Sequence, residues 1–156
     1  MGQMLIVDPA RCTGCRSCET ACSTFREGES SLYKCRVKVV RFPEELFFYP
    51  VVCQQCETPL CAVPCPTNAL QKDNQTGLVE LIRDRCVGCK MCVTACPFGA
   101  ITLVDGYPIK CDLCDGEPAC TRLCEPGAIT LGDDERMGQT QRLLLAGKVR
   151  EAYLAK

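Results

Sequence analysis

Residues 86–97 read Cys-Val-Gly-Cys-Lys-Met-Cys-Val-Thr-Ala-Cys-Pro, with three closely spaced cysteines and a fourth one turn further on. Three other segments of the chain repeat this arrangement with small changes in spacing. The four runs hold sixteen of the seventeen cysteines: Cys12, Cys15, Cys18 and Cys22; Cys53, Cys56, Cys61 and Cys65; Cys86, Cys89, Cys92 and Cys96; and Cys111, Cys114, Cys120 and Cys124. A pattern repeated four times in 156 residues decides the fold.

The spacing within each run is typical of iron–sulfur ligands. Three thiolates fit one tight loop, and the fourth is carried by a short helix toward the second cluster of a pair. Four runs supply four sets of four thiolates, so we expect four [4Fe–4S] clusters. Structural zinc usually takes two separated pairs of ligands and gives no reason for a triplet followed by a fourth cysteine. The odd cysteine count and the repeated spacing also disfavour a disulfide framework.

The composition restricts the class of protein further. Apolar residues make up 47%, but cysteine supplies much of this fraction and aromatic residues are only 6%, so we expect the clusters to act as the core. The net charge of −1 disfavours a nucleic-acid surface. No stretch approaches the roughly 18 apolar residues of a membrane span. The N-terminal residues show neither a signal-peptide nor a twin-arginine pattern, and we therefore expect a cytoplasmic protein without membrane association.

The chain contains no histidine, and its acidic residues lie in turns or beside the cysteine runs. Histidine-based catalysis and histidine-ligated metals are therefore excluded, and we expect no catalytic residues. Lys90 and Lys110 lie in or beside the ligand loops. Two explanations of these lysines remain open, since they either raise a local reduction potential or serve solubility.

Short strands are predicted between the cysteine runs. Residues 69–72 and 78–81 flank a polar loop, and residues 101–104 and 107–109 flank Asp-Gly, the strongest short hairpin signal. The alternating, Val-rich residues 32–42 predict another strand. With one-turn helices at the ligand loops, the predicted fold is α+β, a duplicated bacterial-ferredoxin-like arrangement around four clusters.

Two parts of the chain lie outside the repeat. Residues 23–52 include Arg36, Lys38 and Arg41, which we interpret as a solvated strand face rather than a docking patch. They also include Cys35, which fits no run and is predicted to be a small buried side chain rather than a ligand or redox switch.

The other part outside the repeat is the C-terminal tail. We expect residues 1–134 to form the cluster domain and residues 135–156 to form a helical tail, with one apolar side that includes Leu143–Leu145 and Val149. This helix either packs on its own domain or docks in a partner's groove. The domain assignment treats it as a docking element.

Residues 53–61 read Cys-Gln-Gln-Cys-Glu-Thr-Pro-Leu-Cys, and residues 110–120 read Lys-Cys-Asp-Leu-Cys-Asp-Gly-Glu-Pro-Ala-Cys. With these unequal spacings and four runs, residues 4 to about 132 resemble the four-cluster electron-transfer subunits of molybdopterin oxidoreductases. Small members of that family serve formate dehydrogenases, formate hydrogenlyase, carbon monoxide dehydrogenase and tungsten-dependent aldehyde oxidoreductases. Some members hold a three-iron cluster where an aromatic residue replaces one ligand, but every position here is Cys.

The resemblance implies how the runs share clusters, because in that family the inner runs (53–65 and 86–96) pair with each other and so do the outer runs (12–22 and 111–124). The implied ligand sets are Cys12, Cys15, Cys18 and Cys124 for cluster 1; Cys53, Cys56, Cys61 and Cys96 for cluster 2; Cys86, Cys89, Cys92 and Cys65 for cluster 3; and Cys111, Cys114, Cys120 and Cys22 for cluster 4.

The resemblance also implies a function. We expect a non-catalytic subunit that conducts single electrons between a molybdenum- or tungsten-pterin catalytic subunit, with an aldehyde oxidoreductase favoured, and another redox partner such as a flavin subunit that serves nicotinamide. Two alternatives remain open: a freely diffusing polyferredoxin, and a scaffold whose head-to-tail contacts build a filament.

Overall fold

The computed structural model describes residues 2–133 and, beyond them, residues 138, 142, 146, 147, 150 and 154. The predicted C-terminal tail, residues 135–156, lies outside the described residues except for these isolated positions. The strands are β1 (Met4–Val7), β2 (Lys38–Phe42), β3 (Phe47–Val51), β4 (Leu70–Lys72), β5 (Val79–Leu81), β6 (Thr102–Val104), β7 (Tyr107–Ile109) and β8 (Ile129–Gly132). The α-helices are α1 (Ser17–Glu27), α2 (Met91–Ala95) and α3 (Ala119–Arg122), and 3-10 turns cover Pro9–Arg11, Pro43–Glu45, Arg83–Arg85 and Leu113–Gly116.

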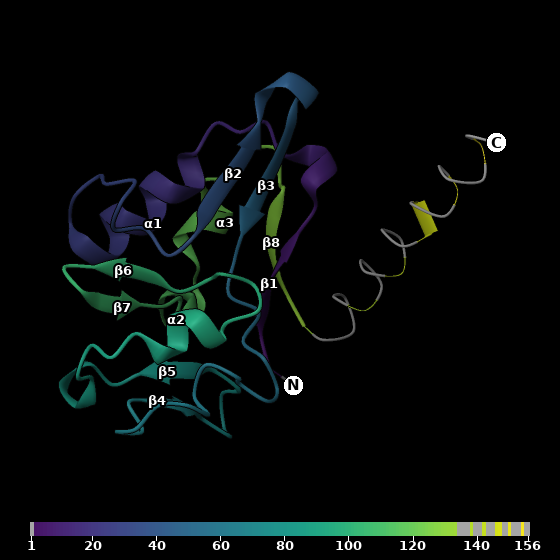
Figure 1. Cartoon of the computed structure of the whole chain (residues 1–156). Helices are drawn as coiled ribbons and strands as arrows, with labels where there is room; N and C mark the ends of the chain where they lie inside the picture. The colour runs from purple at the N-terminus through teal and green to yellow at the C-terminus, as the bar shows by residue number, and fades with distance from the viewer. Residues whose placement is uncertain are drawn as a thin grey trace.

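The strands of the described part form four two-stranded antiparallel sheets, which pair β1 with β8, β2 with β3, β4 with β5, and β6 with β7. The hairpins β4–β5 and β6–β7 confirm the two hairpins predicted from sequence. The β1–β8 pair, in which Val7 lies opposite Ile129, joins segments far apart in the chain (Figure 1). Short antiparallel pairs with short helices confirm the predicted α+β class.

The two larger cores of the described part correspond to the two pairs of cysteine runs, and a small third cluster joins Ala21, Cys114 and Ala119. One contains Leu5 and Val7 of β1, Ile129 of β8 and cysteines of the outer runs, and α1 packs on α3 beside it. The other contains Leu70 of β4, Val79 of β5, Ile101 and cysteines of the inner runs. Cysteines occupy central places in both cores, as the low aromatic content suggested.

The helices α1 and α2 differ in length because a different residue comes after the last cysteine of each. In α2, Cys96 is the C-terminal cap, and the next residue, Pro97, disfavours helical conformation at Cys96 and does not continue the helix. In α1, Ser23 comes after Cys22, and the helix continues to Glu27 before Gly28 ends it in the left-handed conformation, with φ of 72°. The prediction of one-turn helices was therefore wrong for α1, which has 11 residues.

The predicted strand over residues 32–42 begins only at Lys38. Upstream of it, the Ser31 amide donates to Ser23 Oγ of α1 at 2.9 Å, and the Cys35 thiol donates to the Leu32 carbonyl at 3.2 Å. These contacts hold the segment in bends against α1. They also use a backbone amide and a backbone carbonyl that would otherwise be available to pair with a neighbouring strand.

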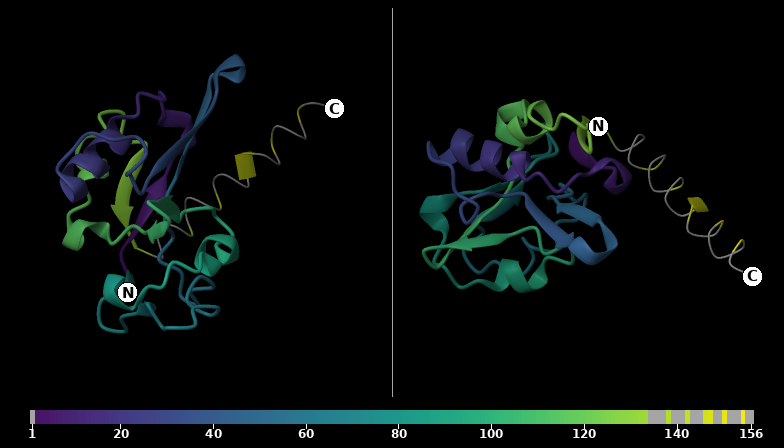
Figure 2. Two further views of the ribbon diagram at one scale, coloured as in Figure 1. Left: turned by 60° about the vertical axis from the view of Figure 1, so that its left-hand side comes forward. Right: turned by 90° about the horizontal axis from the view of Figure 1, so that it is seen from above.

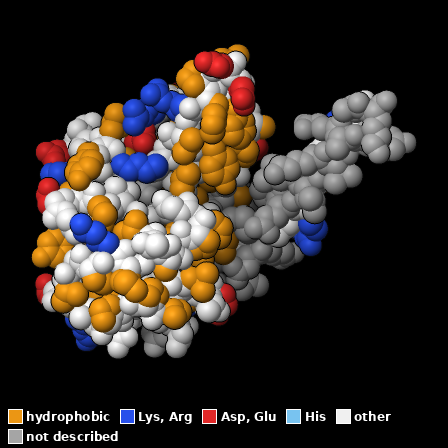
Figure 3. All heavy atoms as spheres, in the orientation of Figure 1, with side chains coloured by type: hydrophobic (Ala, Val, Ile, Leu, Met, Phe, Trp, Pro, Cys, Tyr) orange, Lys and Arg blue, Asp and Glu red, His pale blue; other side chains and the backbone are white. Residues whose placement is uncertain are grey.

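The β2–β3 ribbon projects beyond the rest of the described chain (Figure 2). Its exposed surface is apolar, with Phe42 and Phe47 side by side and Leu46 80% exposed at the turn, next to Glu44 and Glu45 at the tip (Figure 3). In residues 2–133 and the isolated positions beyond them, no helix has the length and apolar character needed to span a bilayer.

We expect Leu5→Ala to destabilise the half of the protein built on β1 and β8. Leu5 is 1% exposed, and Leu→Ala in a core costs about 2–5 kcal/mol. The denaturant concentration at which half of the visible cluster absorbance is lost should fall. Leu46→Ala, at the exposed turn, is the matched control and should leave this midpoint unchanged; equal midpoints in the two variants would contradict the assignment of Leu5 to the core.

Candidate iron–sulfur sites

Four cavities are each lined by cysteines from two runs, and we number them after the predicted clusters. Cavity 1 is lined by Cys12, Cys15, Cys18 and Cys124; cavity 2 by Cys53, Cys56, Cys61 and Cys96; cavity 3 by Cys65, Cys86, Cys89 and Cys92; and cavity 4 by Cys22, Cys111, Cys114 and Cys120, with Cys53 also in its wall. Their volumes, which include adjoining solvent, are about 300, 350, 310 and 340 Å³ in that order. The structure thus groups the sixteen cysteines into the same four sets that the resemblance implied.

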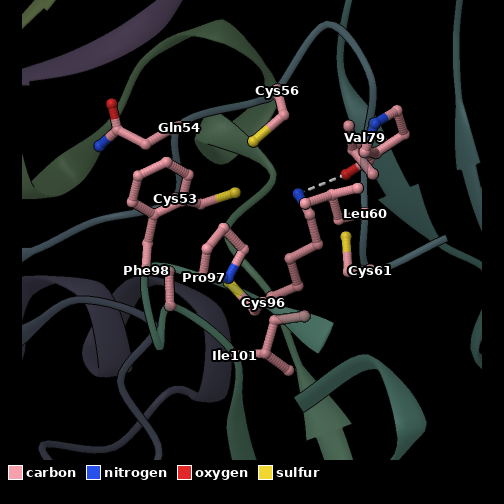
Figure 4. A pocket seen from close by; sticks show the side chains of 13 residues that line it. Cys53, Gln54, Cys56, Leu60, Cys61, Val79, Cys96, Pro97, Phe98 and Ile101 are labelled. Atoms are coloured by element: carbon pink, nitrogen blue, oxygen red, sulfur yellow. Dashed lines mark hydrogen bonds between the residues drawn. The ribbon is translucent and has the colours of Figure 1, made fainter. Parts of the chain in front are cut away.

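The walls around the cysteines are mostly apolar. Cavity 2 is closed by Leu60, Val79, Phe98 and Ile101, whose side chains surround its four thiols (Figure 4). An apolar wall excludes water and lowers the local dielectric constant, which raises the effect of any charge nearby.

The loops of the first and third runs turn tightly at a glycine. Gly14 has φ of 70° and Gly88 has φ of 69°, a left-handed conformation that glycine adopts without steric cost. A Cβ on Gly14 would lie 2.5 Å from Cδ1 of Phe48, and one on Gly88 would lie 3.3 Å from Cε1 of Tyr107. Both loops are therefore packed directly against an aromatic ring, and Gly14 and Gly88 hold equivalent places between the first two cysteines of their runs.

In three of the four runs, a backbone amide donates a hydrogen bond to the sulfur of the last cysteine. Ala69 donates to Cys65 Sγ and Ala128 donates to Cys124 Sγ, each at 3.2 Å and each four residues after its cysteine. Cys22, which has no following proline, receives its bond from the Arg36 amide instead, also at 3.2 Å. Hydrogen bonds to sulfur stabilise thiolate and tune the potential of a bound cluster.

Several thiols of the sites are buried in a way that disfavours their ionisation. Burial raises the pKa of Cys18 to about 12, that of Cys111 to about 12 and that of Cys61 to about 11. Cys15 is exposed, and hydrogen bonds from Ser17 lower its pKa. Iron must displace the protons of the buried thiols, so cluster binding supplies free energy that offsets their burial as anions.

The donor set fits [4Fe–4S] clusters. Each cavity presents three thiols of one run and the last thiol of another, which together make the Cys₄ set of a cubane. Within the described residues, no three Cys, Asp or Glu side chains are arranged to hold a single metal ion, so the thiols surround a volume rather than a point. This arrangement suits a cluster better than the single zinc ion considered from sequence.

Cys35 lies apart from all four cavities. It is 0% exposed, and its thiol donates to the Leu32 carbonyl and receives a bond from Lys38 Nζ at 3.3 Å. The prediction of a small buried side chain is confirmed, although Cys35 precedes β2 rather than lying within a strand.

Sequence reasoning missed Gln55, which is 4% exposed and has φ of 45°. Its Nε2 donates to the Cys111 carbonyl, and its Oε1 accepts from the Val79 amide, both at 2.9 Å. It thereby ties the loop of cavity 2 to the first ligand of cavity 4. One feature of the sequence could have indicated it: two polar residues stand between Cys53 and Cys56, in a run that was expected to be buried.

Comparison with known proteins decides the family. The model of the 4Fe–4S dicluster domain family matches residues 44–134, more than half of the chain. The chain belongs to this family. The match confirms the predicted [4Fe–4S] electron-transfer resemblance and the presence of [4Fe–4S] clusters.

Two curated relatives are similar in sequence. The chain is 35% identical over 125 residues to the putative electron transport protein YsaA of Escherichia coli (strain K12), covering 73% of this chain and 77% of that protein. It is 36% identical over 113 residues to the NADH-dependent phenylglyoxylate dehydrogenase subunit beta of Aromatoleum evansii. That match covers 70% of this chain but only 25% of the longer relative.

A solved structure supports the fold. A chain of the active site complex BamBC of benzoyl coenzyme A reductase aligns with a TM-score of 0.50 at 24% identity, over 99% of this chain and 97% of that one. This likeness supports the ferredoxin-like α+β architecture.

The variants Cys96→Ala and Cys35→Ala should distinguish a cluster ligand, Cys96, from a buried cysteine that binds no cluster, Cys35. Cys96→Ala leaves cavity 2 with three thiols, so the iron content should fall by about one to four atoms per chain. Cys35→Ala should leave the iron content unchanged. Anaerobic purification followed by iron analysis measures both, and equal iron loss in Cys35→Ala would place Cys35 among the ligands.

Proposed function

We propose that this chain is a non-catalytic electron-transfer subunit that holds four [4Fe–4S] clusters, one in each cavity, ligated by the four sets of cysteines given above. A [4Fe–4S] cluster, when bound, accepts and releases one electron at a time. The observation that carries the proposal is the series of four cavities, each lined by at least four thiols, within 156 residues.

Shared elements place the cavities in a definite order. Helix α1 carries Cys18 of cavity 1 and Cys22 of cavity 4, while α2 carries Cys92 of cavity 3 and ends at Cys96 of cavity 2. Cys53 lies in the walls of both cavity 2 and cavity 4. These links give the order 1, 4, 2, 3, with cavities 1 and 3 at the ends.

Exposure of the cysteines follows this order. Cys15 of cavity 1 and Cys89 of cavity 3 are exposed, whereas every cysteine of cavities 2 and 4 is buried or half-buried. A conductor requires solvent-accessible sites only where electrons enter and leave. The two ends of the series are therefore the positions at which redox partners would approach.

The partner that we propose is a molybdenum- or tungsten-pterin catalytic subunit in the cytoplasm, with an aldehyde oxidoreductase favoured. The family resemblance of residues 53–61 and 110–120 supports this choice. The second end of the series suits a flavin subunit, and the similarity to a subunit of an NADH-dependent dehydrogenase supports a nicotinamide-linked component.

Metal analysis tests the cluster number and the partner together. The tagged chain, purified anaerobically from its own host, should contain about sixteen iron atoms per chain together with molybdenum or tungsten. The same iron content without either metal would contradict the proposed pterin partner but would still support a four-cluster electron-transfer protein. About eight iron atoms would contradict four clusters.

Deletion of residues 136–156 distinguishes a docked subunit from a freely diffusing carrier. If the tail docks, the deletion should release the chain from its complex while the iron content and visible spectrum stay unchanged. Unaltered co-purification of the shortened chain would contradict docking through the tail. Light scattering of the intact complex tests the head-to-tail filament, since discrete particles at every concentration exclude it.

A further inference from the structure

Lys110 is a buried cation between two of the cysteine cavities. It is 6% exposed and lies between the end of β7 and Cys111, the first ligand of the last run. Its Nζ donates to the Val79 carbonyl at 2.6 Å, to the Cys111 carbonyl at 2.9 Å and to Gln55 Oε1 at 3.1 Å. The first of these bonds is the dashed line in Figure 4. The ammonium is therefore fixed by three acceptors.

All three acceptors are uncharged, and within the described residues Lys110 has no carboxylate partner. A buried charge without a counter-ion carries a large desolvation cost. The three hydrogen bonds offset part of this cost but leave the net positive charge in place. A negatively charged group in the adjoining space would complete the compensation.

Lys110 lines two spaces. One is an open polar cleft that it shares with Glu80 and Asp112, neither of which forms an ion pair with it. The other is cavity 2, which Lys110 lines together with Cys53, Cys56, Cys61 and Cys96. A cubane bound by four thiolates in cavity 2 would be the negatively charged counter-ion that the ammonium lacks. Reduction adds one more negative charge, so a fixed cation at the wall stabilises the reduced form and raises the potential.

Other charged side chains near the sites are paired or exposed. Arg36 and Asp112, which line cavity 4, form ion pairs with Glu27 and Arg26. Glu19, 1% exposed and next to Cys18 of cavity 1, pairs with Arg16, so its charge is compensated within the protein. Lys90, in the loop of cavity 3, is exposed, and water and salt screen its charge. Of the two lysines singled out from sequence, only Lys110 is placed to act on a cluster.

We propose that Lys110 is a positioning residue that raises the reduction potential at cavity 2 and so makes this inner site, at the junction of the two pairs, a place where the electron is held. The inference deepens the proposed function and rests on it. A merely structural role, in which Lys110 only fastens Val79 to Cys111, would affect stability without moving one potential in a defined direction.

The test is a redox titration of the purified holo-protein followed by electron paramagnetic resonance, with Lys110→Met as the charge-removing variant. One midpoint potential should move to more negative values. At a fixed solution potential, the ratio of reduced to oxidised cluster should fall at least tenfold, which corresponds to about 59 mV for a one-electron couple. The potential that moves should be the one altered or missing in Cys96→Ala.

Two further variants keep the test decisive if Lys110→Met loses its clusters. Gln55→Glu puts a carboxylate next to the ammonium, in place of the amide oxygen at 3.1 Å, and should shift the same potential in the same negative direction. Lys110→Arg keeps the positive charge. At the same fixed solution potential, the ratio of reduced to oxidised cluster should therefore change by less than tenfold. Lys90→Met, the matched exposed control, should leave all potentials unchanged.

The outcomes distinguish this inference from the function on which it rests. About sixteen iron atoms with no potential moved by either Lys110→Met or Gln55→Glu would overturn the role of Lys110 and leave the four-cluster conductor. A wild-type protein without four clusters would overturn the conductor itself. A uniform shift of all potentials would indicate a change of fold rather than a charge at cavity 2.

Discussion

The meeting of cysteines from two distant runs in each cavity is the constraint on which the rest of the structure depends. Each run gives three thiols to one cavity and its last thiol to another, so no cavity is complete until two runs have met. The shared helical turn between Cys18 and Cys22, or between Cys92 and Cys96, then holds two cavities a fixed short distance apart. Close spacing of neighbouring sites is therefore a consequence of how the sites are built, not an additional feature.

The sequence determined the sites more completely than the fold around them. Cysteine spacing and the family resemblance predicted the four cysteine sets that the cavities bring together, although not the place of Cys53 in the wall of cavity 4 as well. The Asp-Gly and polar loops predicted both hairpins. Pairing of β1 with β8 was missed, because no local pattern links Met4 to Gly132. The length of α1 depends on Ser23 in place of a proline, a small change with a large geometric effect. Burial of Lys110 was undecided, because loop sequence alone does not show which residues pack over it.

The two cores also explain why so few aromatic residues suffice. Cysteines of the outer runs lie among Leu5, Val7 and Ile129, and cysteines of the inner runs lie among Leu70 and Val79, so the thiols themselves form much of each core. Burial raises the pKa of Cys18, Cys120 and Cys92 among them, so this environment disfavours bare thiolate at these positions. Iron supplies the compensating charge, which makes cluster binding and folding parts of one equilibrium.

The segment between the first two runs contacts the cysteine cavities, which its composition did not predict. Arg36 was predicted to be solvated, but its side chain pairs with Glu27 at 2.9 Å and its amide bonds to Cys22 Sγ. Further along, Phe48 of β3 lies against Gly14, and Val39 and Pro50 line cavity 1. The ribbon thus covers one side of the end site that contains the exposed Cys15. Under the proposed function, a redox partner would therefore approach this end from the side on which Cys15 is exposed.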